Sequence, residues 1–171
     1  PKPGPEDVFV KMEACNICTT DYQQWMGLRD HQGFPMAEGH EFVGIVIAKG
    51  ERVSSSINIG DRVGQAYTCC GYCDACRLGF SSDCENVEGK MIDEEGFLGD
   101  KSFANYKIIP QRYVVKISKD LPAAEAAFLE PVATAVQGIR KADIQPTQTV
   151  VVIGAGTMGL VNAQVARAWG A

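Results

Sequence analysis

The sequence of 171 residues has no long apolar stretch, no block of basic residues and no apolar segment near its start. Its longest uncharged apolar run, Phe42 to Ala48, is far shorter than the ~20 residues of a membrane-spanning helix. Residues 1–10 contain no signal-peptide core, which favours a cytoplasmic protein. With 16 basic and 21 acidic residues, the chain offers no electrostatic footprint for nucleic acid, so small molecules are the expected partners.

The composition is that of a folded protein, because 46% hydrophobic and 22% charged residues exclude a disordered or collagen-like chain. The length is sufficient to bury a sizeable core. The first residue is Pro1 and no initiator Met is present. We therefore expect the sequence to be a fragment of a longer protein.

Cysteine is the most informative residue type, since five of the seven cysteines lie between Cys69 and Cys84. Counted from Cys70, the spacing C-x2-C-x2-C-x7-C predicts a tetrahedral zinc site with four thiolates. A bacterial ferredoxin cluster would need x3 and a following Pro, and disulfides are disfavoured by the odd count. A closed four-cysteine site is structural rather than catalytic. The expected ligands are Cys70, Cys73, Cys76 and Cys84, with Cys69 as a spare thiol.

Alternating and β-branched patterns predict a β-rich body over most of the chain. Thr19, Thr20 and Asp21 are typical N-cap residues and predict a helix at Tyr22–Met26. The predicted strands are Val8–Ala14, Phe42–Ala48, Arg62–Val63 with Ala66–Tyr67, Asn105–Ile109 and Tyr113–Ile117.

The composition changes after the last of these strands. Ala123–Leu129 is rich in Ala and predicts a helix, and Pro131 suits the first turn of a second helix at Val132–Ala142. Val150–Ile153 is continuously apolar, as in a buried parallel strand, and apolar residues recur at helical spacing from Met158 to Trp169.

A glycine-rich loop, Gly154-Ala155-Gly156-Thr157-Met158-Gly159, connects that strand to that helix. The G-x-G-x-x-G pattern in this context is the fingerprint of dinucleotide binding. The glycines permit a tight turn and close approach of the pyrophosphate, and the helix N-terminus supplies N–H donors.

Together these motifs resemble those of the zinc-dependent medium-chain alcohol dehydrogenases, over essentially the whole sequence. The family's zinc signature is matched by Gly39-His40-Glu41-x2-Gly44-x5-Gly50-x2-Val53, and Gly60-Asp61-Arg62-Val63 also falls where expected. The resemblance implies a fold of mixed α/β and β class. A GroES-like β-rich catalytic domain is expected at residues 1–131, followed by the beginning of a Rossmann domain at 132–171.

The resemblance also implies the ligands of a catalytic zinc. Cys18 would be the first ligand and His40 the second, while Cys15 would not bind the metal. Glu130 stands where many members carry a third cysteine, and the pair Glu130-Pro131 is similar to the sorbitol, threonine and butanediol dehydrogenase branch. A carboxylate would complete the shell, and whether Glu41 or Glu130 binds directly stays open.

Further roles follow from the same resemblance. Thr20 would hold the hydroxyl beside the reacting oxygen, Asp21 would orient His40, and Glu130 would act in the catalytic shell. Trp25 and Phe103 are candidates for the substrate pocket. The expected cofactor-binding residues are Thr19, Gly154, Gly156, Thr157, Met158 and Gly159.

The implied activity is reversible hydride transfer between a secondary alcohol or polyol and NAD or NADP, with two zinc ions per chain. Alternatives are amino-alcohol oxidation of the threonine dehydrogenase type and a zinc-stabilised binding module without catalysis. The acidic residue that selects NAD would lie about 20 residues after Gly154, beyond Ala171. We expect these residues alone to be inactive and the longer protein to form a homo-oligomer.

Overall fold

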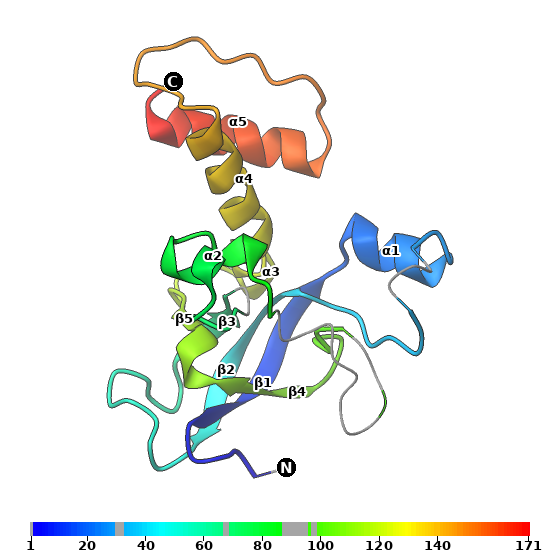
Figure 1. Ribbon diagram of the computed structural model, residues 1–171, viewed down its shortest axis with the longest axis vertical. Helices are drawn as coiled ribbons and strands as arrows, with labels where there is room; N and C mark the ends of the chain where they lie inside the picture. Colours follow the sequence, from blue (N-terminus) through cyan, green and yellow to red (C-terminus); the bar gives the residue numbers. More distant parts are fainter. Residues whose placement is uncertain (1, 30–32, 67–68, 87–95, 97–98) are drawn as a thin grey trace. The chain divides into compact units, whose positions relative to one another are not determined.

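The computed structural model describes residues 2–29, 33–66, 69–86, 96 and 99–171 (Figure 1). The chain divides into two compact units, Pro1–Ala127 and Phe128–Ala171, each of which is described by itself. The division lies slightly before the domain boundary expected from the sequence.

The first unit is built on one five-stranded sheet with the order β4-β1-β2-β3-β5 (Figure 1). Every neighbouring pair is antiparallel. The β-rich body predicted from alternation is confirmed, although β3 ends at Gln65 and Tyr67 lies outside the described residues. The strands are β1 (Asp7–Asn16), β2 (Glu41–Lys49), β3 (Arg62–Gln65), β4 (Tyr106–Pro110) and β5 (Val114–Lys116).

The pairing of β1 with β2 determines which residues meet at one end of the sheet. Asn16, the last residue of β1, pairs with Glu41, the first residue of β2. The register shifts between Phe9 and Val10 and again before Ala14, as β-bulges do where a strand bends. The segments that follow β1 and precede β2 are therefore brought together.

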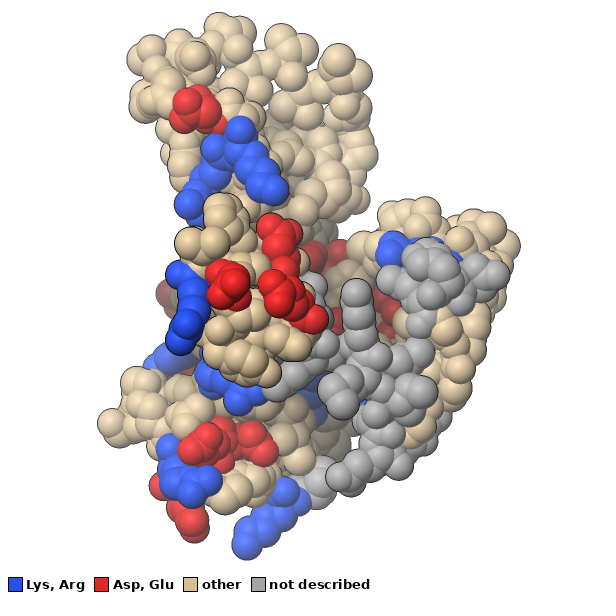
Figure 2. All heavy atoms as spheres, in the orientation of Figure 1, with Lys and Arg blue, Asp and Glu red and all other residues tan. Residues whose placement is uncertain are grey.

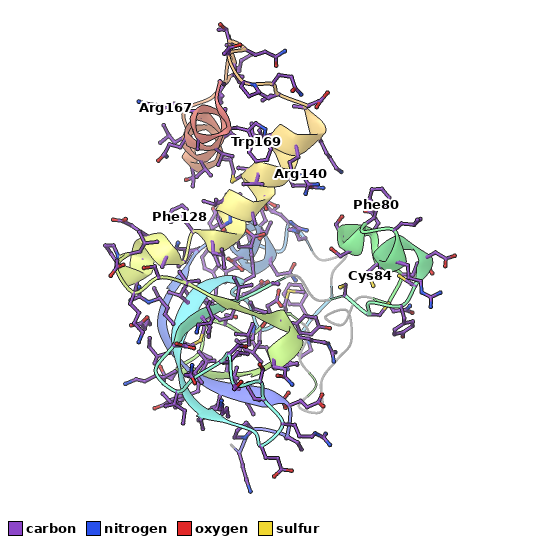
Figure 3. The ribbon with its side chains drawn as sticks, turned by 90° about the vertical axis from the view of Figure 1, so that its left-hand side faces the viewer. Phe80, Cys84, Phe128, Arg140, Arg167 and Trp169 are labelled. Carbon is purple, nitrogen blue, oxygen red and sulfur yellow. The ribbon has the colours of Figure 1, made fainter. Side chains whose placement is uncertain are left out.

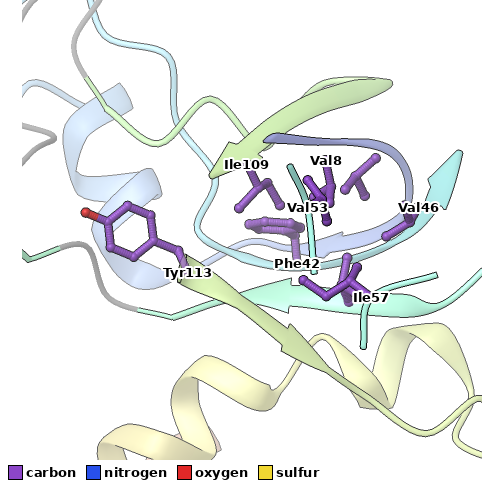
Figure 4. Packing of buried hydrophobic residues seen from close by; sticks show 9 residues of the cluster. Val8, Phe42, Val46, Val53, Ile57, Ile109 and Tyr113 are labelled. Carbon is purple, nitrogen blue, oxygen red and sulfur yellow. The ribbon is translucent and has the colours of Figure 1, made fainter. Parts of the chain in front are cut away.

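The larger of two buried clusters in the first unit is shown in Figure 4, and a smaller one is formed by Val43, Ala126 and Ala127. Val8 and Val10 are fully buried, and burial of such a side chain contributes roughly 1.5–3 kcal/mol. The hydroxyl of Tyr113 points away from the cluster and donates a hydrogen bond to the carbonyl of Cys69 at 3.0 Å. The cluster comprises Val8, Val10, Phe42, Val46, Val53, Ile57, Val63, Ile109 and Tyr113.

The first helix, α1 (Thr19–Trp25), begins earlier than predicted, and its N-cap is Cys18 rather than Thr19, Thr20 or Asp21. That prediction was wrong because Asp21 acts from inside the helix. Its Oδ2 accepts the backbone N–H of Cys18 at 2.7 Å, as the third residue of a capping box does.

The Ala-rich segment also differs from its prediction, because it forms a short helix, α3 (Ala123–Ala126), that ends before Leu129. A new helix, α4 (Leu129–Lys141), then begins after Phe128. Pro131 is the third residue of α4, where a missing N–H removes no intrahelical hydrogen bond, so the helix starts before Pro131.

The second unit packs α4 against α5 (Thr157–Trp169). Helix α4 buries Pro131, Ala135 and Ile139, which recur every four residues on one face. Arg140 of α4 and Trp169 of α5, both labelled in Figure 3, line a hollow together with the turn at residues 143–146.

The predicted strand at Val150–Ile153 is not formed, and Val151 and Ile153 are 80% and 97% exposed. A strand requires a hydrogen-bonded neighbour, and the described residues of this unit contain no second strand for it to join. The apolar run therefore remains an extended connection before α5.

None of the described helices is both long and apolar enough to cross a membrane. On the face shown in Figure 2, basic side chains lie in small groups beside acidic ones among the coloured residues. This distribution agrees with the lack of basic blocks in the sequence.

An ion pair between buried Arg62 and partly exposed Glu13 ties β3 to β1, and Arg62 also binds the segment before α3. The Nε of Arg62 lies 2.7 Å from Oε2 of Glu13, and Nη1 of Arg62 donates to the carbonyl of Ser118 at 3.1 Å. Arg62 is 8% exposed, so these partners replace water for its charge.

We predict that Arg62→Leu lowers the free energy of unfolding by about 2 kcal/mol, because the carbonyls of Ser118 and Leu121 lose a buried, charged donor and Glu13 loses its ion pair. Arg52→Leu is the matched control, since Arg52 pairs with Glu6 at 3.5 Å where both side chains are more than half exposed. Its loss should stay below about 1 kcal/mol. Urea unfolding followed by circular dichroism measures both variants, and equal losses would contradict the prediction.

Candidate metal centres

The cysteine lobe, residues 69–86, is held by α2 (Asp74–Arg77) and the 3-10 helix η2 (Ser81–Asp83). The ligand atoms of Cys70, Cys73, Cys76 and Cys84 all lie within 4.8 Å of one another. Figure 3 shows Cys84 and the neighbouring sulfur atoms in this lobe.

The sulfur spacing fits a tetrahedral metal ion. Sγ of Cys70 lies 4.0 Å from Sγ of Cys76, and four thiolates about 2.3 Å from zinc would be about 3.8 Å apart. Backbone N–H groups already point at the sulfurs, with Cys73 N donating to Cys70 Sγ at 3.4 Å and Cys70 N to Cys84 Sγ at 3.3 Å. The lobe is therefore preformed around a common centre.

The thiols of the lobe have unequal proton affinities. Burial raises the pKa of Cys70, but hydrogen bonds from the backbones of Tyr72 and Cys73 and from Asn86 outweigh it and lower the value to about 6. Burial raises the pKa of Cys76 to about 12, and hydrogen bonds with the other cysteines add to this increase. A divalent cation at the centre would favour all four thiolates.

A second group lies at the end of the sheet where β1 meets β2. The ligand atoms of Cys18, His40 and Glu41 all lie within 4.8 Å of one another. Cys18 follows β1 by two residues, and His40 and Glu41 stand at the start of β2, so the β1–β2 pairing brings them together. A thiolate, an imidazole and a carboxylate are a suitable donor set for zinc.

Asp21 connects this group to the backbone around it. Its carboxylate is 4% exposed and accepts N–H groups from Cys18 at 2.7 Å and from Gly39 at 3.2 Å. Oδ1 of Asp21 also lies 3.4 Å from Nδ1 of His40. A carboxylate at Nδ1 fixes the imidazole orientation and leaves Nε2 available to a metal.

The residues expected around the ligands differ in their placement. Thr20 is half-buried in the first turn of α1, next to exposed Thr19. Trp25 and Phe103, expected in the substrate pocket, are 78% and 46% exposed. Cys15 is outside the ligand group, and burial, followed by the charge of Asp21, raises its pKa to about 11.

Glu130 belongs to the second unit and is described apart from the Cys18–His40–Glu41 group. It is exposed in the first turn of α4, where its Oε1 accepts a hydrogen bond from Thr134 at 3.4 Å. Whether Glu41 or Glu130 binds a metal directly therefore stays open.

The glycine loop has the backbone that its sequence requires. Gly154 has a backbone φ of +110°, which residues with a side chain rarely adopt. Gly156 is the N-cap of α5. A Cβ at Gly159 would overlap the carbonyl oxygen of Gly154, so only glycine permits this approach. Thr157 and Met158 form the first turn of α5, whose N–H groups could receive a phosphate.

Two charged residues near the Cys18–His40–Glu41 group were not identified from the sequence. Oε1 of Glu38 is buried and has no hydrogen-bond partner among the described residues. Burial, a hydrogen bond with Asp21 and the charge of Asp21 raise the pKa of Glu38 to about 7. Lys107 is a lysine inside strand β4, and its position between Tyr106 and Ile108 was the available signal.

Comparison with known proteins gives consistent results for sequence and structure. Residues 4–119 match the alcohol dehydrogenase GroES-like domain. The whole chain is 36% identical to an L-threonine 3-dehydrogenase of Deinococcus deserti and 31% identical to the L-galactonate-5-dehydrogenase of Escherichia coli, covering 49% and 48% of those proteins.

Solved structures agree with these matches. Galactitol-1-phosphate dehydrogenase of Escherichia coli has a TM-score of 0.85 at 30% identity, with 100% of this chain and 48% of that chain covered. A protein of Sinorhizobium meliloti, described as a zinc-binding dehydrogenase and solved with NADP, has a TM-score of 0.83 at 34% identity, with 100% and 48% covered. The chain thus spans about half the length of the relatives it matches. It belongs to the family of the alcohol dehydrogenase GroES-like domain.

Proposed function

We propose that this chain is part of a zinc-dependent dehydrogenase that transfers a hydride between a secondary alcohol or polyol and NAD or NADP. The observation that carries the proposal is the Cys18–His40–Glu41 group, supported by Asp21 and separate from the cysteine lobe. A zinc-stabilised binding module would need only the four cysteines. The presence of a second, mixed donor set therefore favours an enzyme.

In the proposed mechanism Cys18, His40 and Glu41 would hold a zinc ion, which would supply Lewis acidity toward the substrate hydroxyl and lower its pKa. Asp21 holds Nδ1 of His40 and two backbone N–H groups, which keeps the ligand side chains in place. Thr20, two residues after Cys18, hydrogen-bonds the substrate oxygen and relays its proton, accepting it while its own hydroxyl proton passes to water or to the cofactor ribose. The loop at Gly154–Gly159 holds the cofactor pyrophosphate at the N-terminus of α5, with Thr19 as a further cofactor contact.

We further propose a catalytic domain at residues 1–131 and the start of a dinucleotide-binding domain at 132–171. Cytoplasmic location and homo-oligomerisation are part of the same proposal.

A threonine-type amino alcohol is the second candidate substrate. It is favoured by the identity of 36% with an L-threonine 3-dehydrogenase. Assays of the protein that contains this sequence, with polyols, L-threonine and both cofactors, test the proposal. The proposal would be refuted if none of the tested secondary alcohols were oxidised with NAD or NADP.

We predict two zinc ions per chain, because the two groups draw on separate residues. Cys73→Ser should release one zinc and destabilise the lobe strongly, since a structural zinc contributes folding free energy, about 10–16 kcal/mol in small peptides. His40→Ala should reduce the zinc content to one while the lobe stays folded.

Cys69→Ser is the matched control, because Cys69 is outside the four-cysteine group, and it should keep two ions. Elemental analysis measures all variants. One zinc in the unmodified protein, or loss of zinc from Cys69→Ser, would contradict the assignment.

We predict that Thr20→Ala lowers kcat at least about 100-fold with zinc content unchanged, because it removes a hydroxyl that moves a proton but no ligand. Thr20→Ser keeps the hydroxyl and should retain most of the activity. Steady-state kinetics with metal analysis checks both, and parallel loss of zinc and activity would make Thr20 structural.

We also predict that the two candidate carboxylates differ in their effect on metal binding. If Glu41 is the direct ligand, as its place in the group favours, Glu41→Ala weakens catalytic-site zinc at least about tenfold. Glu130→Ala should then lower turnover with little change in zinc affinity. Chelator competition measures the affinities, and the reverse order would assign the metal to Glu130.

A further inference from the structure

A short loop runs alongside the segment that carries the histidine ligand. The backbone N–H groups of Lys101, Ser102 and Phe103 donate to the carbonyls of Ala37, Gly39 and Glu38 at 2.9, 3.2 and 3.1 Å. A Cβ at Gly39 would lie only 2.6 Å from the backbone nitrogen of Phe103. The loop at 100–103 is therefore packed directly against the residues that precede His40.

Lys107 of β4 holds this loop from the sheet side. Its Nζ donates to the carbonyl of Asp100 at 2.6 Å and to Oγ of Ser102 at 2.9 Å. Ser102 is fully buried, so its hydroxyl has a fixed environment. The two hydrogen bonds join the loop to the strand.

The same ammonium group also contacts the strand that follows the ligands. Nζ of Lys107 lies 4.6 Å from the centroid of the Phe42 ring, within the range of a cation–π interaction. Phe42 directly follows Glu41, and the loop held by Lys107 contacts the residues before His40. Lys107 thus acts on the His40–Glu41 pair from both sides.

The environment of Lys107 makes these contacts worth more than those of a surface lysine. Burial is the largest effect on its pKa, which falls to about 8, while the charges of Asp100 and Cys15 oppose the decrease and that of Lys101 adds to it. At neutral pH the side chain is thus a partly buried cation with two hydrogen-bond acceptors. Charge-assisted hydrogen bonds are strong in such surroundings.

We propose that Lys107 is a positioning residue for the Cys18–His40–Glu41 site, holding the backbone on both sides of His40 and Glu41 in the metal-binding geometry. The proposal rests on the proposed function, because it requires this group to bind a metal. It predicts that loss of the ammonium group weakens metal binding at this site and leaves the cysteine lobe unaffected.

The test uses the protein that contains this sequence, with its four-cysteine site first filled with zinc. Cobalt is then titrated into the Cys18–His40–Glu41 site and followed by its thiolate-to-metal absorption. Lys107→Met keeps the side-chain length and removes the charge, and it should weaken cobalt binding about 10–100-fold, as loss of an outer-shell partner does. Lys107→Arg restores a cation and should recover most of the affinity.

Lys49→Met is the matched control. Nζ of Lys49 also donates to two loop carbonyls, of Ser54 at 3.3 Å and Ile57 at 2.6 Å, at the opposite end of β2 from Glu41. The Lys49→Met variant should leave the cobalt affinity unchanged. Release of zinc from the four-cysteine site to a colorimetric chelator serves as the internal reference for each variant.

Selective weakening in Lys107→Met, with the reference and the control unchanged, supports the proposal. Unchanged cobalt affinity, or equal weakening of both metal sites, overturns it. If Lys107→Met does not fold, Ser102→Ala is tested instead, because it removes one hydrogen-bond acceptor of the Lys107 ammonium group. A smaller loss of affinity at the cobalt site alone then supports the proposal. An unchanged cobalt affinity overturns it. Failure of the unmodified protein to bind cobalt would refute the proposed function itself and this inference with it.

Discussion

The antiparallel pairing of β1 with β2 is the constraint on which the candidate catalytic centre depends. In that register Asn16 faces Glu41, so the chain leaving β1 and the chain entering β2 meet at one end of the sheet. Cys18 and His40 are distant in sequence and are neighbours only because of this pairing. Asp21 then joins the two segments by accepting N–H groups from both Cys18 and Gly39. The sheet brings Cys18 and His40 close together, and the carboxylate of Asp21 holds their segments in position.

The two metal-binding groups are organised by different kinds of contact. In the cysteine lobe all four ligands lie within one short segment, and backbone N–H groups of the same segment point at the sulfurs. The Cys18–His40–Glu41 group instead depends on residues from α1, β2 and the loop at 100–103. A local site can form around its ion with little help, whereas a non-local site requires the completed sheet. This difference is consistent with the proposed structural role of the cysteine lobe and the proposed catalytic role of the Cys18–His40–Glu41 group.

Much of the first unit could be predicted from the sequence, because alternation in β1 and β2 and the spacing of the cysteines are local signals. The Cys18–His40–Glu41 group could be named as a candidate site only through resemblance, since no local pattern connects Cys18 with His40. Lys107 and Glu38 were missed because charged residues in such places are usually exposed. Val150–Ile153 has a strand composition, but composition cannot supply the neighbour that a strand needs.

The strand order has a consequence for how the protein is made. Strand β1, which begins at Asp7, lies between β4 and β2 in the sheet, and β4 ends only at Pro110. During synthesis at about 5–20 residues per second, β4 leaves the ribosome on the order of 5–20 s after β1. Throughout that interval β2 can pair with one edge of β1, but the other edge lacks β4, its neighbour in the described sheet, and is open to other chains. The nascent chain is therefore most exposed to aggregation before its sheet is complete, and a chaperone that covers extended apolar segments would act in that interval.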